Sequence, residues 1–196
     1  LYGRATMVCE LPDRLFINAL HPVVLPTLTE HARAGRSLRE PYLLALTHMS
    51  ALLWPGLLCL ALLANPVVRL LLGPQWGDVP PLVRIMALGA LSLFPAFMTF
   101  PMMVALGRIR DTLLMSIISL PPSILVIFAL SNFGLEAVAA AQLINAPLQV
   151  FVAITFIRRQ VPISWTDIAA AVGPSAIVAI CTVAMPAAVI EMTGFR

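Results

Sequence analysis

The stretch Thr112-Leu-Leu-Met-Ser-Ile-Ile-Ser-Leu-Pro-Pro-Ser-Ile-Leu-Val-Ile-Phe-Ala-Leu130 holds no charged residue, and it decides the fold class. A helix needs about 20 apolar residues to cross the hydrocarbon core of a bilayer, and this stretch comes close to that length. Five further stretches share its apolar character. The chain is therefore predicted to be an all-α integral membrane protein, a multi-span helical bundle. The six predicted spans cover residues 5–28, 42–64, 81–106, 112–130, 135–157 and 167–190.

The composition supports a membrane protein made of one transmembrane domain over residues 1–196. Of its residues, 60% are hydrophobic and only 11% are charged, whereas a soluble domain carries about 25% charged residues. All 12 basic residues are arginine, and they stand at the ends of apolar segments rather than on one face. The net charge of +3 therefore indicates membrane topology and no nucleic-acid partner.

The arginines collect in every second gap between the predicted spans. The gaps 29–41, 107–111 and 158–166 share this property, whereas 65–80 and 131–134 hold little charge. Because short loops rich in arginine stay in the cytoplasm, the three arginine-rich gaps are predicted to be cytoplasmic. Seven of the twelve arginines lie in them: Arg33, Arg36, Arg39, Arg108, Arg110, Arg158 and Arg159.

Local signals mark the ends and the bends of the spans. Ser164 and Asp167 have the spacing of a capping box, in which Ser164 is the N-cap of the last helix. Trp76 and Trp165 fall where aromatic side chains favour the headgroup level. Many spans also contain proline, which removes a backbone donor and kinks a helix. Bent helices around a cavity are typical of transporters, although proline is common in membrane helices generally.

The first span is unusual because polar residues interrupt its apolar run. At about 100° per residue, three of them fall on one stripe, and two stand four positions apart, close enough to form an ion pair. The pair has two interpretations, a structural contact or part of a stripe that lines a cavity. In a cavity, the arginine could receive a phosphate. The polar residues are Glu10, Asp13, Arg14, Asn18 and His21, of which Glu10 and Arg14 form the predicted pair.

The fifth span carries a second, uncharged stripe made of Gln142, Asn145 and Gln149. Their spacing places them on one helix face. Hydrogen bonding between helices is one interpretation, and contact with a sugar is the other. We include Gln142 and Asn145 among the candidate residues for a substrate cavity.

Catalytic and metal-binding motifs are missing from the sequence. It contains none of the motifs H-E-x-x-H, G-x-S-x-G, P-loop or C-x-x-C. His21, His31 and His48 do not share the spacing of metal ligands. We therefore expect no enzyme activity, no metal site and no cofactor.

Several stretches resemble a known family of membrane proteins. They are Pro22 to Tyr42, Asn65-Pro-Val-Val-Arg-Leu-Leu-Leu-Gly-Pro-Gln-Trp76, Leu106-Gly-Arg108 and Phe133-Gly-Leu-Glu-Ala-Val-Ala139. Together they resemble the oligosaccharide and polysaccharide flippases of the multidrug/oligosaccharidyl-lipid/polysaccharide (MOP) exporter superfamily. The Leu-Leu-Gly-Pro-Gln-Trp element is the most specific of them.

The resemblance implies a fold and a function. The fold is a MATE-like transporter of roughly 12 to 14 helices in two similar lobes. The six spans would form most of the second lobe, and the N-terminal lobe of the same chain would be missing. The implied function is transport of an undecaprenyl-diphosphate-linked oligosaccharide across the bacterial inner membrane, by alternating access. The substrate cavity would lie between the two lobes.

The sequence leaves three other functions open. A multidrug cation antiporter of the same superfamily would use Glu10 and Asp13 as proton or sodium sites. A flippase for lipid-linked peptidoglycan precursors is a close variant of the first hypothesis. A glycan-polymerising membrane enzyme would need a large outer loop with catalytic groups, whereas the outer gap 65–80 is short and holds only Asp78 as an acidic residue.

Overall fold

The computed structural model describes the backbone of residues 1–193, and within it all side chains except those of residues 13, 15–23, 185 and 187–193. Every regular element in residues 1–193 is helical, and no strand occurs there. The elements are α1 (Tyr2–Arg33), α2 (Arg39–Leu62), α3 (Ala64–Leu72), the 3-10 turn η1 (Pro74–Trp76), α4 (Pro80–Phe97), α5 (Thr99–Ala105), α6 (Ile109–Ser131), α7 (Leu135–Gln160) and α8 (Trp165–Thr193).

The fold is the predicted all-α bundle of membrane-spanning helices, but the number of spans differs from the prediction. Within the described residues, five helical segments are long and apolar enough to cross a membrane. They are Arg39–Leu62, Pro80–Ala105, Ile109–Ser131, Leu135–Gln160 and Trp165–Ala184. These segments coincide with the second to sixth predicted spans, the sixth as far as residue 184. The first predicted span, 5–28, lies in one continuous helix of 32 residues but is not among the five found in the described part of the chain. Three charged residues interrupt this segment, and residues 13 and 15–23 within it lie outside the described side chains.

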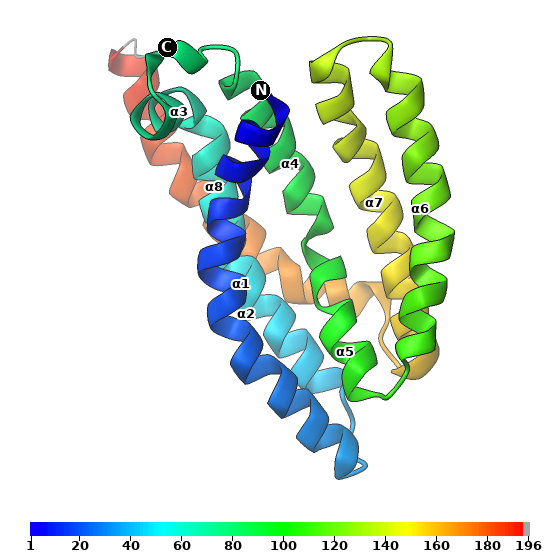
Figure 1. Cartoon of the computed structure of the whole chain (residues 1–196). Coiled ribbons are helices and arrows are strands. Elements are labelled where there is room, and N and C mark those ends of the chain that lie inside the picture. The colour runs from blue at the N-terminus through cyan, green and yellow to red at the C-terminus, as the bar shows by residue number, and fades with distance from the viewer. Residues whose placement is uncertain (194–196) are drawn as a thin grey trace.

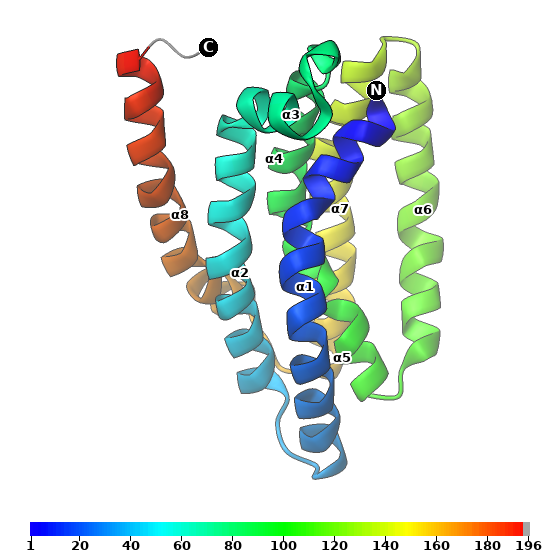
Figure 2. The same cartoon turned by 60° about the vertical axis from the view of Figure 1, so that its left-hand side comes forward.

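The arginine-rich gaps all lie at one end of the bundle. In both views, the loops that join α1 to α2, α5 to α6 and α7 to α8 lie toward the lower end (Figures 1 and 2). The short helix α3 and the loop between α6 and α7 lie at the opposite end. The chain therefore crosses the bundle in the alternation that the arginine pattern predicts.

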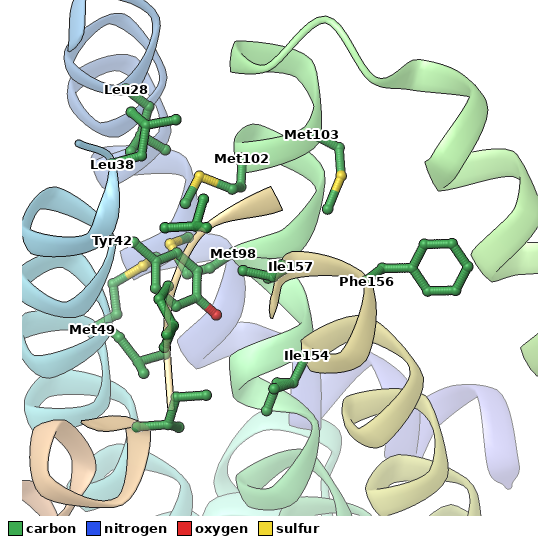
Figure 3. Packing of buried hydrophobic residues seen from close by; sticks show 14 of the residues in the cluster. Leu28, Leu38, Tyr42, Met49, Met98, Met102, Met103, Ile154, Phe156 and Ile157 are labelled. Atoms are coloured by element: carbon green, nitrogen blue, oxygen red, sulfur yellow. The ribbon is translucent and has the colours of Figure 1, made fainter. Parts of the chain in front are cut away.

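The interior is built around α4, which packs against α1, α2 and α7, while α8 packs on α2 and α6 on α7. One buried cluster, toward the arginine-rich end, is rich in methionine (Figure 3). In it, Tyr42 and Met49 of α2 meet Met98, and Ile154 and Ile157 approach from α7. Methionine is flexible and fills irregular gaps, which suits the junction of several bent helices.

The third predicted span is broken at Met98, between α4 and α5. Pro101 explains the break, because proline has no N–H to donate to the carbonyl of Phe97 four residues earlier. The outer gap 65–80 also departs from the expected short loop, since it contains α3 and η1. Gly73 separates them with φ 95°, a backbone conformation that glycine adopts without strain.

The start of α8 confirms the predicted capping box. The backbone N–H of Ser164 donates to Oδ2 of Asp167 at 2.9 Å, and the backbone N–H of Thr166 donates to Oγ of Ser164 at 3.3 Å. Arg39 of α2 also pairs with Asp167, at 2.8 Å between Nη2 and Oδ1. The cap therefore fixes the start of α8 against the start of α2.

Candidate functional site

Glu10 and Arg14 form the ion pair that the sequence predicts on α1. Nη2 of Arg14 donates to Oε2 of Glu10 at 2.8 Å, one helical turn away. The Arg14 side chain is 64% exposed and the Glu10 side chain 45% exposed. The Glu10 carboxylate therefore accepts one hydrogen bond from the Arg14 guanidinium. Most N–H donors of the guanidinium stay free for another partner.

The pair lies on the face of α1 that points away from the other helices. Ala5, Val8 and Cys9 are buried on the opposite face, against residues of α2 and α4. Oxygen of Val83 on α4 accepts a hydrogen bond from Sγ of Cys9 at 3.4 Å. At about 100° per residue, the buried face and the charged face are roughly 170° apart. Packing of α1 on the bundle therefore turns the ion pair outward.

Arg14 lies well inside α1, which is not among the five segments that are apolar enough to cross a membrane. Residue 14 is about 18 Å along the helix axis from Tyr2, and the helix of 32 residues extends well beyond it. A charge that faces lipid within a membrane costs at least ~2.5 kcal/mol. The outward face of α1 is therefore better suited to water or another polar surface than to lipid.

Three of the predicted site residues lie where side chains are not described. Asp13, Asn18 and His21 belong to the continuous helix α1, but their side chains are outside the described residues. Their part in a polar stripe stays a prediction.

The second predicted stripe lies between α7 and α4. Gly89 of α4 packs so closely on Gln142 that a Cβ atom there would lie 2.6 Å from Cγ of Gln142. Asn145 is buried, with 3% of its surface exposed, and Gln149 is half-buried. Since α4 packs against both α1 and α7, it separates this stripe from the Glu10–Arg14 pair (Figure 1). The structure therefore does not bring the two sets together.

Two cavities at the arginine-rich end were not foreseen from the sequence. One, of about 570 Å³, is lined by Arg39, Arg158, Arg159 and Asp167 among others. The Arg158 guanidinium stands 5.5 Å from the centroid of the Trp165 ring, which stacks on Phe151 at 5.9 Å. The interfacial position of Trp165 stays a prediction.

The second cavity, of about 870 Å³, is a groove between the last turns of α1 and the first turns of α2. Polar residues including His31, Arg36, Glu40 and His48 line it together with apolar ones. The sequence places Arg36 in the arginine-rich gap 29–41, but it does not predict that these four residues share a cavity. Their shared position results from the turn between α1 and α2, which residue spacing along one helix does not reveal.

The described side chains include no group of three His, Cys, Asp or Glu residues that could hold a metal ion. The described polar groups are an ion pair on a helix face and two cavities rich in arginine or histidine. Such groups bind and orient anionic or polar ligands.

The fold and the outward ion pair define the chain as a multi-pass helical membrane protein with a charged helix face. Comparison with known proteins adds a family similarity over part of the chain. The profile of the family Polysaccharide biosynthesis protein (Polysacc_synt_3) matches residues 1–81, which run from α1 to the start of α4. No curated protein and no solved structure matches the chain. The similarity to a polysaccharide family is thereby confirmed for the part that holds Glu10, Arg14 and the groove between α1 and α2.

Proposed function

We propose that the chain is part of a transporter that moves a lipid-linked oligosaccharide across the bacterial inner membrane for polysaccharide biosynthesis. The family match over residues 1–81 and the five membrane-spanning helices support this function. The single observation that carries it is the Glu10–Arg14 pair on the outward face of α1. Charges within a membrane pair with one another or face a wet cavity, and the exposed ion pair of α1 fits the cavity that transporters provide.

In the proposed mechanism, Arg14 binds the diphosphate that joins the lipid to the sugar. Glu10 holds the guanidinium through one Nη2 bond, at 2.8 Å, so that the remaining donors can form a two-pronged contact with phosphate oxygens. The oligosaccharide stays in the water of the cavity. Alternating access of the two lobes then exposes the cavity first to the cytoplasm, at the arginine-rich end, and then to the outside.

Gln142 and Asn145 have a secondary place in this proposal. Asn145 is buried and Gln142 lies against Gly89. They could reach the substrate only in a state in which α7 moves relative to α4. Asp13, Asn18 and His21 would continue the polar stripe of α1 along the cavity.

The test is export of surface polysaccharide by the full-length protein in cells that lack their own copy. Arg14→Ala is expected to lower export about tenfold or more, because a hydrogen bond to a charged group contributes about 1.5–3 kcal/mol. Arg14→Lys keeps the charge but lacks the planar guanidinium. Its export is expected to lie between that of the wild type and that of Arg14→Ala. Arg69→Ala, an exposed arginine on α3, is the matched control and is expected to export normally.

Unchanged export by Arg14→Ala, at equal protein abundance, would contradict the assigned site. The cation antiporter gives a different result in the same cells, since Glu10→Gln would then abolish efflux of a cationic dye and leave polysaccharide export intact.

A further inference from the structure

The groove between α1 and α2 is charged at one end and apolar in its deeper part. A phospholipid has the same order, with a charged headgroup followed by apolar acyl chains. Its volume of about 870 Å³ is within the range of ligand sites. From Glu40 to Met49, the wall formed by α2 extends about 14 Å along the helix axis. This length is close to half of the roughly 30 Å hydrocarbon thickness of a bilayer, so the groove spans about one leaflet.

The deeper part of the groove is mainly apolar. Val24 and Leu28 of α1 face Leu44, Ala45 and Met49 of α2 across it. Leu28 and Met49 are fully buried and form its floor, whereas Leu44 is 62% exposed at its edge. Such a surface fits the first part of a lipid acyl chain.

The other end of the groove, at the α1–α2 turn, carries two opposite charges that are not paired with one another. Arg36 and Glu40 both line the groove and both are exposed. Among the described side chains, neither of them forms an ion pair. The end of the groove therefore presents a cation for a phosphate and an anion for an ammonium group within one cavity.

Neighbouring polar groups could add hydrogen bonds to a phosphate at Arg36 and to an ammonium group at Glu40. The Nδ1 atom of His31 lies 2.9 Å from the carbonyl oxygen of Thr27. Because a carbonyl oxygen only accepts, Nδ1 carries the proton, and Nε2 of the neutral ring is left as an acceptor. The Ser37 Oγ atom accepts from the backbone N–H of Arg39 at 3.3 Å, so its own hydroxyl proton is free to be donated. His48, deeper in the groove, is bonded in the same way as His31, to Leu44.

We propose that this groove binds a phospholipid whose headgroup carries both a phosphate and a primary ammonium group, of the phosphatidylethanolamine class. Arg36 and Ser37 bind the phosphate, and Glu40 and His31 accept hydrogen bonds from the ammonium. The acyl chains follow the apolar wall toward Met49. The lipid sits in the leaflet at the arginine-rich end and is a bound component of the protein, separate from the transported substrate and from the Glu10–Arg14 pair.

The chemistry of the groove distinguishes this headgroup from the other common ones. A phosphatidylcholine headgroup has a quaternary ammonium with no N–H to donate to Glu40. A phosphatidylglycerol headgroup carries the same phosphate but a neutral glycerol, so it offers Glu40 hydroxyl groups and no positive charge. The ethanolamine headgroup alone among these three offers Glu40 both a positive charge and N–H donors.

The experiment is native mass spectrometry of the full-length protein, titrated with phosphatidylethanolamine, phosphatidylcholine and phosphatidylglycerol of identical acyl chains. The wild-type protein is expected to bind the ethanolamine lipid about tenfold more tightly than either of the others, since one charge-assisted hydrogen bond differs. Glu40→Gln is expected to abolish the preference over choline. Arg36→Gln is expected to weaken binding of all three lipids.

Glu30→Gln and Arg33→Gln are the matched controls, because both residues are exposed at the same helix end and neither lines the groove. They are expected to bind like the wild type. Equal affinity of the wild type for the three headgroups would overturn the proposal, and so would Glu40→Gln or Arg36→Gln variants that behave like the controls. The comparison of the three lipids on the wild-type protein needs no substitution. It therefore tests the proposal even if one of the variants fails to fold.

Discussion

Helices α1 and α6 both expose one side to the surroundings of the bundle, but α1 exposes charged as well as apolar residues there. Only 11% of the most apolar window of α6 is buried inside the protein. Its outward side chains are all apolar along one face, with exposed fractions from 56% to 73%: Leu113, Ile117, Leu120, Ile124 and Phe128. The outward face of α1 instead carries the Glu10–Arg14 pair, with Met7 and Leu11 exposed beside it.

This difference indicates that the two faces meet different environments. Apolar side chains gain nothing from water, and α6 therefore suits contact with lipid. A charged pair is costly in lipid, and in the proposed transporter this face of α1 would meet a water-filled cavity. Burial alone does not distinguish a face in lipid from a face in water, because both faces are exposed. The chemistry of the exposed residues distinguishes them.

The largest effect is expected from a charge placed on the lipid-facing side of α6. Leu120→Arg, near the middle of α6, is expected to lower membrane insertion and the yield of folded protein, with a cost of at least ~2.5 kcal/mol. Leu120→Ala leaves the face apolar and is the control. The measurement is the amount of protein that elutes as one species in detergent. Normal yield for Leu120→Arg would show that this face of α6 is not in lipid.

A smaller effect is expected where the interior is tightly packed, between α4 and α7. Gly89→Leu is expected to destabilise the protein by about 1–3 kcal/mol, because any Cβ at this position collides with Gln142. Leu88→Ile, on the exposed neighbouring position, should change stability little. Thermal unfolding in detergent, followed by tryptophan fluorescence, measures the difference.

A compensating change sharpens this second prediction. Gly89→Ala is also expected to destabilise the protein, by less than Gly89→Leu, because its Cβ would lie 2.6 Å from Cγ of Gln142. Gln142→Ala removes that Cγ but keeps the Cβ at 3.1 Å, so the double variant is expected to recover part of the loss caused by Gly89→Ala. If Gly89→Ala is as stable as the wild type without compensation, then α4 and α7 are not packed as closely as the structure shows.

The smallest effect is expected from the polar contact between α2 and α8. Ser50 Oγ donates to Ser175 Oγ at 2.8 Å, and both side chains are buried. A double-mutant cycle with Ser50→Ala and Ser175→Ala is expected to give a coupling of about 0.6 kcal/mol, the average for such bonds in membrane proteins. Additive effects of the two substitutions, measured by the same unfolding assay, would show that the bond does not stabilise the pair of helices.

The sequence predicted the helices well where one local signal decides the structure. The apolar run of 112–130 predicts a helix that the structure shows as α6. The spacing of Ser164 and Asp167 predicts the cap that begins α8. The ion pair of Glu10 and Arg14 followed from a spacing of four residues along one helix. Each of these features depends only on residues within a few turns of one another.

Features that depend on several helices were missed. The groove requires the return of the chain at Arg36, which brings His31 of α1 beside Glu40 of α2. The surroundings of the cysteines also depend on packing: Cys9 is buried, Cys59 is half-buried and Cys181 is exposed on α8. The separation of Gln142 from Arg14 follows from the position of α4, which periodicity within a single span cannot give.

The most direct test of the contrast between α1 and α6 is the reactivity of single cysteines in the full-length protein. Cys9, Cys59 and Cys181 are first replaced by alanine. Arg14→Cys and Leu120→Cys are then treated in membranes with a charged, water-soluble maleimide, which reacts with the thiolate and so requires water. We expect Arg14→Cys to react at least about ten times faster than Leu120→Cys. Equal rates, or protection of the thiol at position 14 from both sides of the membrane, would contradict a wet cavity beside α1.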